Sequence, residues 1–185
     1  MMGIWTFFLG VDGPNVLFLN MGDGRFLLAE REKWRSGAEN TLSLALGDID
    51  GDGSLDIVEG NGFPAGANRI YLFRRGRFLP FTSRIKCPVM DDTSYIFLED
   101  LDGKSGLDIV VLNRQGPRNF ISDSKVLVND GDGFFLNSIK IQGFESPNCG
   151  AAFDVDGDGV LDLVIGCGDG LEVCLKKAGC FYSVQ

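Results

Sequence analysis

The sequence predicts an all-β fold in which four-stranded units follow one another in tandem. Three observations indicate this: an acidic loop motif that occurs three times, a Gly-x-Phe hairpin motif that occurs four times, and short β-prone runs between them. The chain of 185 residues is long enough for one domain with a sizeable core. Apolar residues make up 44% and charged residues 23%, which is ordinary for a globular protein.

The acidic motif has the complete form D-x-D-x-D-G-x-x-D. It occurs as DIDGDGSLD from residue 48, as DLDGKSGLD from residue 100 and as DVDGDGVLD from residue 154. The first aspartates of successive copies are 52 and 54 residues apart, a spacing typical of repeat architectures. Eleven of the 26 acidic residues lie in these loops, so the net charge of −9 is local to them.

The second motif is a β-prone run, a Gly-containing turn and a Gly-x-Phe strand. Turns such as NMGDG and NDGDG favour hairpins, because Gly, Asn and Asp tolerate positive φ. Each period then contains a strand before the acidic loop, a strand after it, and the two strands of the hairpin. Four antiparallel strands repeated in tandem are typical of β-propeller blades. The four copies end at Phe26, Phe78, Phe135 and Phe181.

We therefore expect a single repeat domain over residues 1–185 with about 3.5–4 blades, at 1–37, 38–90, 91–143 and 144–185. The first blade lacks an acidic loop and the strand before it, so it is incomplete. Closed propellers have about four to eight blades, so we expect a partial or open propeller, a fragment or half of an assembly. Its unpaired end blades favour self-association.

Composition excludes several classes of function. No histidine is present, which removes the commonest general base and the commonest zinc ligand. No basic stripe indicates nucleic-acid binding, and no apolar run approaches the ~20 residues of a membrane span. The five cysteines form no CxxC pair, so we expect buried free thiols, with a bridge such as Cys149 to Cys167 as the alternative.

The first loop also matches the calcium loop of an EF-hand, with Glu59 at its twelfth position. An EF-hand loop lies between two helices, but the residues after Asp56 contain Gly and Pro that break a helix. The twelfth position is Val111 in the second loop and Ile165 in the third. We therefore interpret Glu59 as a bystander at a solvent-facing strand position and predict a loop between two strands.

The acidic loops, together with the hairpins NVLFLNMGDGRF and KVLVNDGDGFF, resemble the FG-GAP/VCBS repeats of integrin-α-type β-propellers, from about residue 5 to 185. The resemblance implies a calcium ion in each intact loop, at the turn between the first two strands of a blade. It also implies an extracellular or cell-surface location. The start, MMGIWTFFLG, has no basic region and no cleavage site, so we expect a strand there and no export signal.

Calcium takes six to eight oxygen ligands at about 2.3–2.6 Å, and alternate aspartates in a tight loop can supply them. The alternative is a solvated turn that holds no ion. The predicted ligands are Asp48, Asp50, Asp52, the Ser54 carbonyl and Asp56 in the first loop, and Asp154, Asp156, Asp158, the Val160 carbonyl and Asp162 in the last.

The middle loop departs from the pattern. Asp100, Asp102 and Asp108 are in place, but Lys104 and Ser105 occupy the fifth and sixth positions. The lysine ammonium can replace the charge of a cation, so this loop either binds calcium weakly or is a turn without an ion.

These features predict a calcium-stabilised module that binds or adheres to a protein or a glycan, without catalytic residues. The alternative is a fragment of a carbohydrate-active lyase or hydrolase, because related propellers occur in such enzymes. The two carboxylates of a glycosidase pair in space and need no fixed spacing in the sequence.

Overall fold

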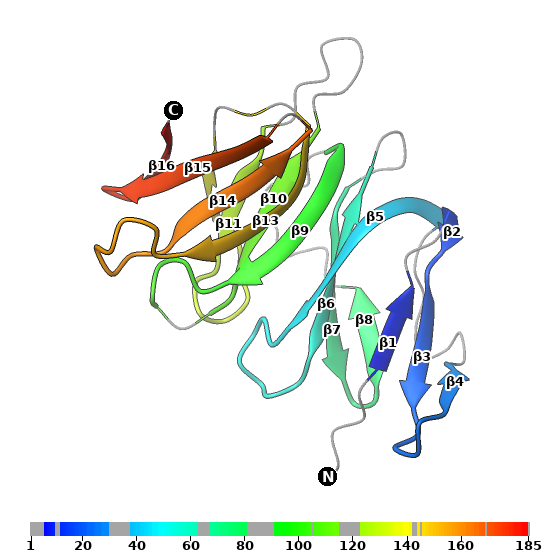
Figure 1. Cartoon of the computed structure of the whole chain (residues 1–185). Helices are drawn as coiled ribbons and strands as arrows, with labels where there is room; N and C mark the ends of the chain where they lie inside the picture. Colours follow the sequence, from blue (N-terminus) through cyan, green and yellow to red (C-terminus); the bar gives the residue numbers. More distant parts are fainter. Residues whose placement is uncertain are drawn as a thin grey trace.

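The computed structural model describes residues 6–9, 12–29, 38–62, 67–80, 91–104, 106–114, 123–141, 144, 146–168 and 170–184. Within these ranges the chain forms β-strands arranged in four antiparallel sheets, and it has no helix long and apolar enough to cross a membrane. The sheets lie side by side as the blades of an open arc (Figure 1). The all-β, propeller-type prediction is therefore confirmed.

We number the sheets as blades 1 to 4 along the chain. Blade 1 contains β1 (Thr6–Leu9), β3 (Val16–Asn20) and β4 (Phe26–Leu28). Blade 2 contains β2 (Asp12–Pro14), β5 (Ala38–Gly47), β6 (Asp56–Asn61), β7 (Arg69–Arg74) and β8 (Arg77–Pro80). Blade 3 contains β9 (Thr93–Glu99), β10 (Asp108–Asn113), β11 (Lys125–Val128) and β12 (Asn137–Lys140). Blade 4 contains β13 (Pro147–Phe153), β14 (Asp162–Cys167), β15 (Gly170–Lys177) and β16 (Cys180–Val184).

Blades 3 and 4 have the four-stranded order expected from the repeats, and blade 2 adds β2 as a fifth strand beside β5. β2 comes from the range predicted for the first blade, between β1 and β3 in sequence. The strands β5, β9 and β13 each precede an acidic loop and lie next to one another along the arc (Figure 1). Consequently all three loops lie at the same end of the blades.

Apolar clusters fill the space between neighbouring blades. β6 and β10 are buried along their whole length because a blade covers each of their faces, whereas β14 in the last blade is only partly buried. The clusters contain Leu17, Ile57 and Tyr71 between blades 1 and 2. Between blades 2 and 3 they contain Ile49, Val58, Ile70, Leu72, Ile96, Ile109, Val111, Leu127 and Phe135, and between blades 3 and 4 Leu101, Val110, Leu112, Val126, Ile141, Leu163, Ile165, Cys174 and Phe181.

The expectation that Glu59 faces solvent is wrong. Its side chain is fully buried, and it accepts hydrogen bonds from Asn15 Nδ2 at 2.6 Å and from the Tyr71 hydroxyl at 3.1 Å. Burial, reinforced by the Glu59 charge, raises the pKa of Tyr71 well above its ordinary value. The prediction that Glu59 faces solvent assumes that one face of β6 is open. Blade 1 covers that face.

The described cysteines are all free, so no bridge joins Cys149 to Cys167. Of the four described cysteines only Cys174 is fully buried, and this burial raises the pKa of its thiol to about 11. Cys149 and Cys180 are exposed in the last blade, and this corrects the expectation that the thiols are buried. Cys87 lies outside the described residues.

Candidate metal centres

Three carboxylates converge in each acidic loop, from its first, third and ninth positions. One oxygen from each lies within 4.8 Å of the others, in the groups Asp48, Asp50, Asp56; Asp100, Asp102, Asp108; and Asp154, Asp156, Asp162. Two oxygens on opposite sides of a calcium ion lie about 4.6–5.2 Å apart, so this spacing suits the ion. The structure thus brings together nine of the eleven aspartates that the sequence singled out.

The ninth-position aspartate fixes the loop to its own blade. Asp56 is fully buried, and its two oxygens accept hydrogen bonds from the N–H groups of Ile49 at 3.0 Å and Phe73 at 2.8 Å. Asp108 and Asp162 repeat this arrangement in blades 3 and 4. Burial outweighs these bonds and raises the pKa of Asp56 to about 6, and burial also raises the pKa of Asp108.

The first-position aspartate shapes the turn. Asp48 accepts hydrogen bonds from the N–H groups of Asp52 at 3.1 Å and Gly53 at 2.8 Å. Gly53 has a φ of 83°, a conformation that a residue with a Cβ rarely adopts. Asp154 holds the last loop in the same way, through N–H groups of residues 157 to 159. These hydrogen bonds hold the first and last loops in their turn.

The fifth-position aspartates, Asp52 and Asp158, do not belong to the converging groups. Each accepts a hydrogen bond from the N–H of the seventh residue, Ser54 at 2.8 Å and Val160 at 2.9 Å. The other oxygen of each carboxylate faces a basic side chain. These residues would have to reorient to contact a shared ion.

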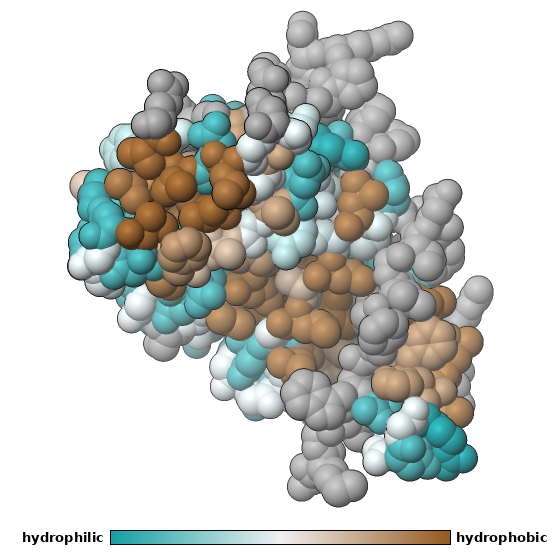
Figure 2. Space-filling view, viewed as in Figure 1, coloured by the Kyte–Doolittle hydropathy of each residue, from teal (hydrophilic) through white to brown (hydrophobic). Residues whose placement is uncertain are grey.

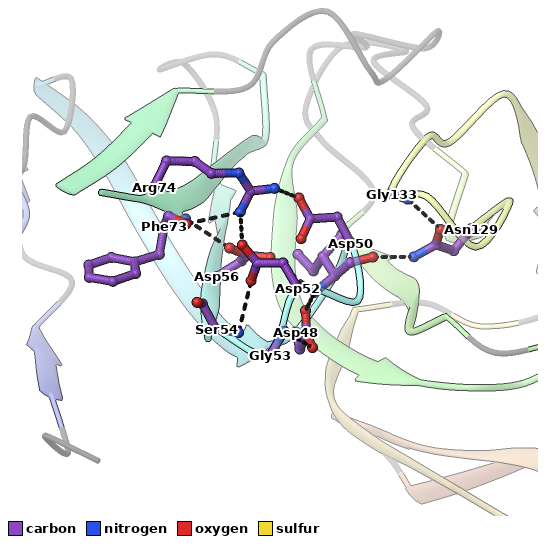
Figure 3. A network of polar contacts seen from close by, with 11 residues as sticks. Asp48, Asp50, Asp52, Gly53, Ser54, Asp56, Phe73, Arg74, Asn129 and Gly133 are labelled. Atoms are coloured by element: carbon purple, nitrogen blue, oxygen red, sulfur yellow. Dashed lines mark hydrogen bonds and ion pairs between the residues drawn. The ribbon is translucent and has the colours of Figure 1, made fainter. Parts of the chain in front are cut away.

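The first and last acidic loops are each covered by a basic side chain, which comes from the end of β7 in blade 2 and of β15 in blade 4. The Arg74 guanidinium pairs with Asp50 and, at 2.5 Å, with Asp52 (Figure 3). In the last loop Lys177 Nζ lies 2.6 Å from both Asp156 and Asp158.

These contacts also change proton affinities. Hydrogen bonds to Asp156 and Asp158 raise the pKa of Lys177 well above its ordinary value, and the bond from Lys177 lowers the pKa of Asp158. These two basic residues were not predicted from the sequence. The pattern that indicates them is a basic residue just before the hairpin turn in both blades that have an intact acidic loop.

The middle loop has the opposite placement of charge. In each blade one N–H group of the hairpin bonds to the ninth-position aspartate, and it belongs to Phe73, Asn129 and Lys176 in turn. The next residue along the chain is Arg74 in blade 2, Asp130 in blade 3 and Lys177 in blade 4. Blade 3 therefore has an acid where blades 2 and 4 have a base. Its base is Lys104, inside the loop, which pairs with Asp102 at 3.0 Å.

Asp50 carries an oxygen without a hydrogen-bond partner. Its side chain is only 4% exposed, and among the described residues Oδ1 is one of two buried side-chain atoms left unsatisfied. Burying a carboxylate oxygen without a partner is unfavourable, typically by about 1–3 kcal/mol or more for a charged group. A cation among these carboxylates would remove that cost.

Tandem four-stranded blades with acidic loops between their first two strands define a repeat protein of the propeller class. A sequence model of the FG-GAP-like repeat matches residues 4–59 and 100–165, so the chain belongs to this family.

Two curated relatives share the sequence over most of this chain. Cartilage acidic protein 1 from Xenopus tropicalis is 27% identical over 177 residues, and that from Homo sapiens is 28% identical over 172 residues. The alignments cover 86% of this chain but 26% and 25% of those proteins, so the chain spans about a quarter of their length.

A solved structure shares the fold. It is that of an Agrocybe aegerita lectin, described as recognising non-reducing terminal N-acetylglucosamine, and it superposes with a TM-score of 0.58 at 21% identity. The match covers 99% of this chain and 52% of the lectin chain.

Proposed function

We propose that this FG-GAP repeat module binds calcium in its loops and uses the ordered loops to bind a protein or a glycan. Calcium bound only by the folded chain stabilises it, by about 2.7 kcal/mol for each site at a hundredfold excess over Kd. Its role in this proposal is to hold the loops rigid, with no part in a reaction.

The observation that carries the calcium proposal is the convergence of three carboxylates in each loop, with a buried oxygen of Asp50 still unsatisfied. Three like charges so close repel one another unless a cation lies between them. Arg74 and Lys177 supply part of this positive charge.

The converging aspartates of the first and last loops would hold the ion. Release of Asp52 from Arg74 and of Asp158 from Lys177 would add a fourth carboxylate to each site. The middle loop, with Lys104 in place of that carboxylate, would bind most weakly, because calcium affinity follows the number of charged ligands.

Binding rather than catalysis is supported by the comparisons, which match a repeat family and a lectin. Terminal N-acetylglucosamine is therefore the first glycan to test. A screen for lyase and hydrolase activity on polysaccharides tests the alternative, since turnover would contradict the proposal.

Calorimetric titration with calcium tests the metal sites. We expect two sites in the wild type, and the loss of one in Asp50→Asn and of the other in Asp156→Asn. Asp132→Asn is the matched control, because Asp132 is an exposed acid of a hairpin turn outside the acidic loops. No heat of binding together with no rise in Tm on adding calcium would contradict the proposal.

A further inference from the structure

The second residue of each acidic loop joins its blade to the next one. The Ile49 side chain is 1% exposed and packs with Leu127 and Phe135 of blade 3. Its carbonyl accepts a hydrogen bond of 2.8 Å from Asn129 Nδ2 (Figure 3). The loop of one blade therefore contacts the hairpin of the following blade through one apolar side chain and one carbonyl.

The junction of blades 3 and 4 repeats this contact. Leu101, the second residue of the middle loop, is 4% exposed and packs with Cys174 and Phe181. Its carbonyl accepts a hydrogen bond of 2.6 Å from Lys176 Nζ. The same junction between blades therefore occurs twice. We call the second residue of the acidic loop, Ile49 or Leu101, its loop half, and the hairpin of the following blade its hairpin half.

Blade 4 presents a loop half at the surface. Val155 is the second residue of the last loop, and its N–H bonds to Asp162 as in the other loops. Its side chain is 40% exposed and Phe153 beside it is 49% exposed. Hydrophobic side chains gather on this outer face, over β14 and β15 (Figure 2).

Blade 1 presents a hairpin half at the surface. Its turn is built like that of blade 3: Gly22 N–H bonds to Asn20 Oδ1 at 2.8 Å, and Gly131 N–H bonds to Asn129 Oδ1 at 2.9 Å. Phe26 corresponds to Phe135, but it is 48% exposed where Phe135 is 2% exposed. By the same alignment, Phe18 and Asn20 correspond to Leu127 and Asn129, the residues that receive Ile49.

We propose that two copies of this chain dock head to tail, the last loop of one on the blade 1 hairpin of the other. Val155 packs between Phe18 and Phe26 of the second copy, and its carbonyl accepts a hydrogen bond from the Asn20 side chain. The junction is the one that Ile49 and Leu101 make inside each chain.

A second copy suits these two surfaces because each chain carries both halves of one junction. Contacts between unlike faces form closed rings where the rotation allows it. Two chains bring twice four sheets, within the roughly four to eight blades of closed propellers. The metal-facing carboxylates take no part, so this docking does not depend on calcium binding.

Analytical ultracentrifugation over a wide concentration range, with and without calcium, tests the proposal. We expect the wild type to show twice the mass of the monomer. Val155→Asp and Phe26→Asp should each weaken association about tenfold or more, because either places a charge in an apolar contact. Leu136→Asp is the matched control, since Leu136 is 54% exposed on a blade with neighbours on both faces. Far-UV circular dichroism confirms that each variant folds.

Mixing the two variants distinguishes this arrangement from others. Val155→Asp keeps an intact hairpin half and Phe26→Asp an intact loop half, so an equimolar mixture should recover dimers that neither forms alone. Higher multiples of the monomer mass that both variants abolish would also support the contact, as a head-to-tail chain that does not close. A wild type that stays monomeric, or variants that associate like the wild type, would overturn the proposal.

Discussion

The Asn129 side chain donates a hydrogen bond of 2.8 Å to the carbonyl of Ile49, a residue 80 positions earlier in the sequence. This bond joins the hairpin of blade 3 to the acidic loop of blade 2 and is buried. The acidic loops are therefore part of the contact between blades as well as candidate ion sites.

Asn129→Ala should lower the free energy of unfolding by about 1–3 kcal/mol, because a buried carbonyl loses its donor. The substitution also removes the oxygen that accepts from Gly131 and Gly133. Asn20→Ala is the matched control at monomer concentrations, since Asn20 makes the same turn in blade 1, where none of this chain's three acidic loops lies against the hairpin. Chemical denaturation measures both changes, and equal losses would contradict a special role for the junction.

Arg74→Gln should tighten calcium binding in the first loop by about two- to fivefold. Half-exposed ion pairs are worth about 0.2–1 kcal/mol, and the arginine must leave Asp50 and Asp52 before an ion contacts both. Calorimetry of the Asp156→Asn background isolates this site. Arg77→Gln, at the start of the next strand, is the control, and a weaker or unchanged affinity in Arg74→Gln would count against competition.

The contribution of Asp56 to the stability of the calcium-free protein should fall as the pH rises from about 4 to about 6, as measured by the difference between the wild type and Asp56→Asn. Asp56 has a pKa of about 6 in the folded chain against 3.8 for the free side chain, so in this window the folded chain keeps a proton that the unfolded chain releases. Calcium binds the ionised form, so the rise in Tm on adding calcium should be larger at pH 7.5 than at pH 5. Equal rises at the two pH values would contradict this prediction.

Tyr71→Phe should destabilise the fold by about 1–3 kcal/mol, because the buried Glu59 carboxylate loses a hydrogen bond of 3.1 Å. The aromatic ring between blades 1 and 2 remains, so the loss reports the hydroxyl alone. Tyr182→Phe is the control, since Tyr182 is 55% exposed. Thermal melting resolves the difference, and similar Tm values for the two variants would contradict it.

The double substitution Lys104→Asp with Ser105→Gly should give the middle loop a calcium site. It restores the complete motif and replaces a cation next to Asp102 by a fourth carboxylate. The stoichiometry measured by calorimetry should rise from two ions to three. Lys104→Ala with Ser105→Gly separates removal of the cation from addition of the ligand, and a stoichiometry of two in both would contradict the prediction.

The repeats predicted the fold class, the strands on each side of the loops and the convergence of their carboxylates, because all of these depend on residues close together in sequence. What the repeats could not supply was the contact between blades. The burial of Glu59 depends on Asn15, which lies 44 residues earlier. The pairing of Arg74 with Asp50 spans 24 residues, and its only sign in the sequence is that Lys177 occupies the corresponding position of the last blade.

The position of Ile49 between blades has a consequence for how an acidic loop tolerates change. Its first and third side chains face the candidate ion, and the second, which alternates with them, faces the next blade. Neighbouring positions of the loop therefore require different side chains. The first and third positions require a short side chain with a ligand oxygen, and the second requires an aliphatic side chain whose volume fits the space between the blades. Random substitution along one loop should show that the range of tolerated residues alternates from one position to the next. Val155 should tolerate as few substitutions as Ile49 only if the chain associates through the last loop.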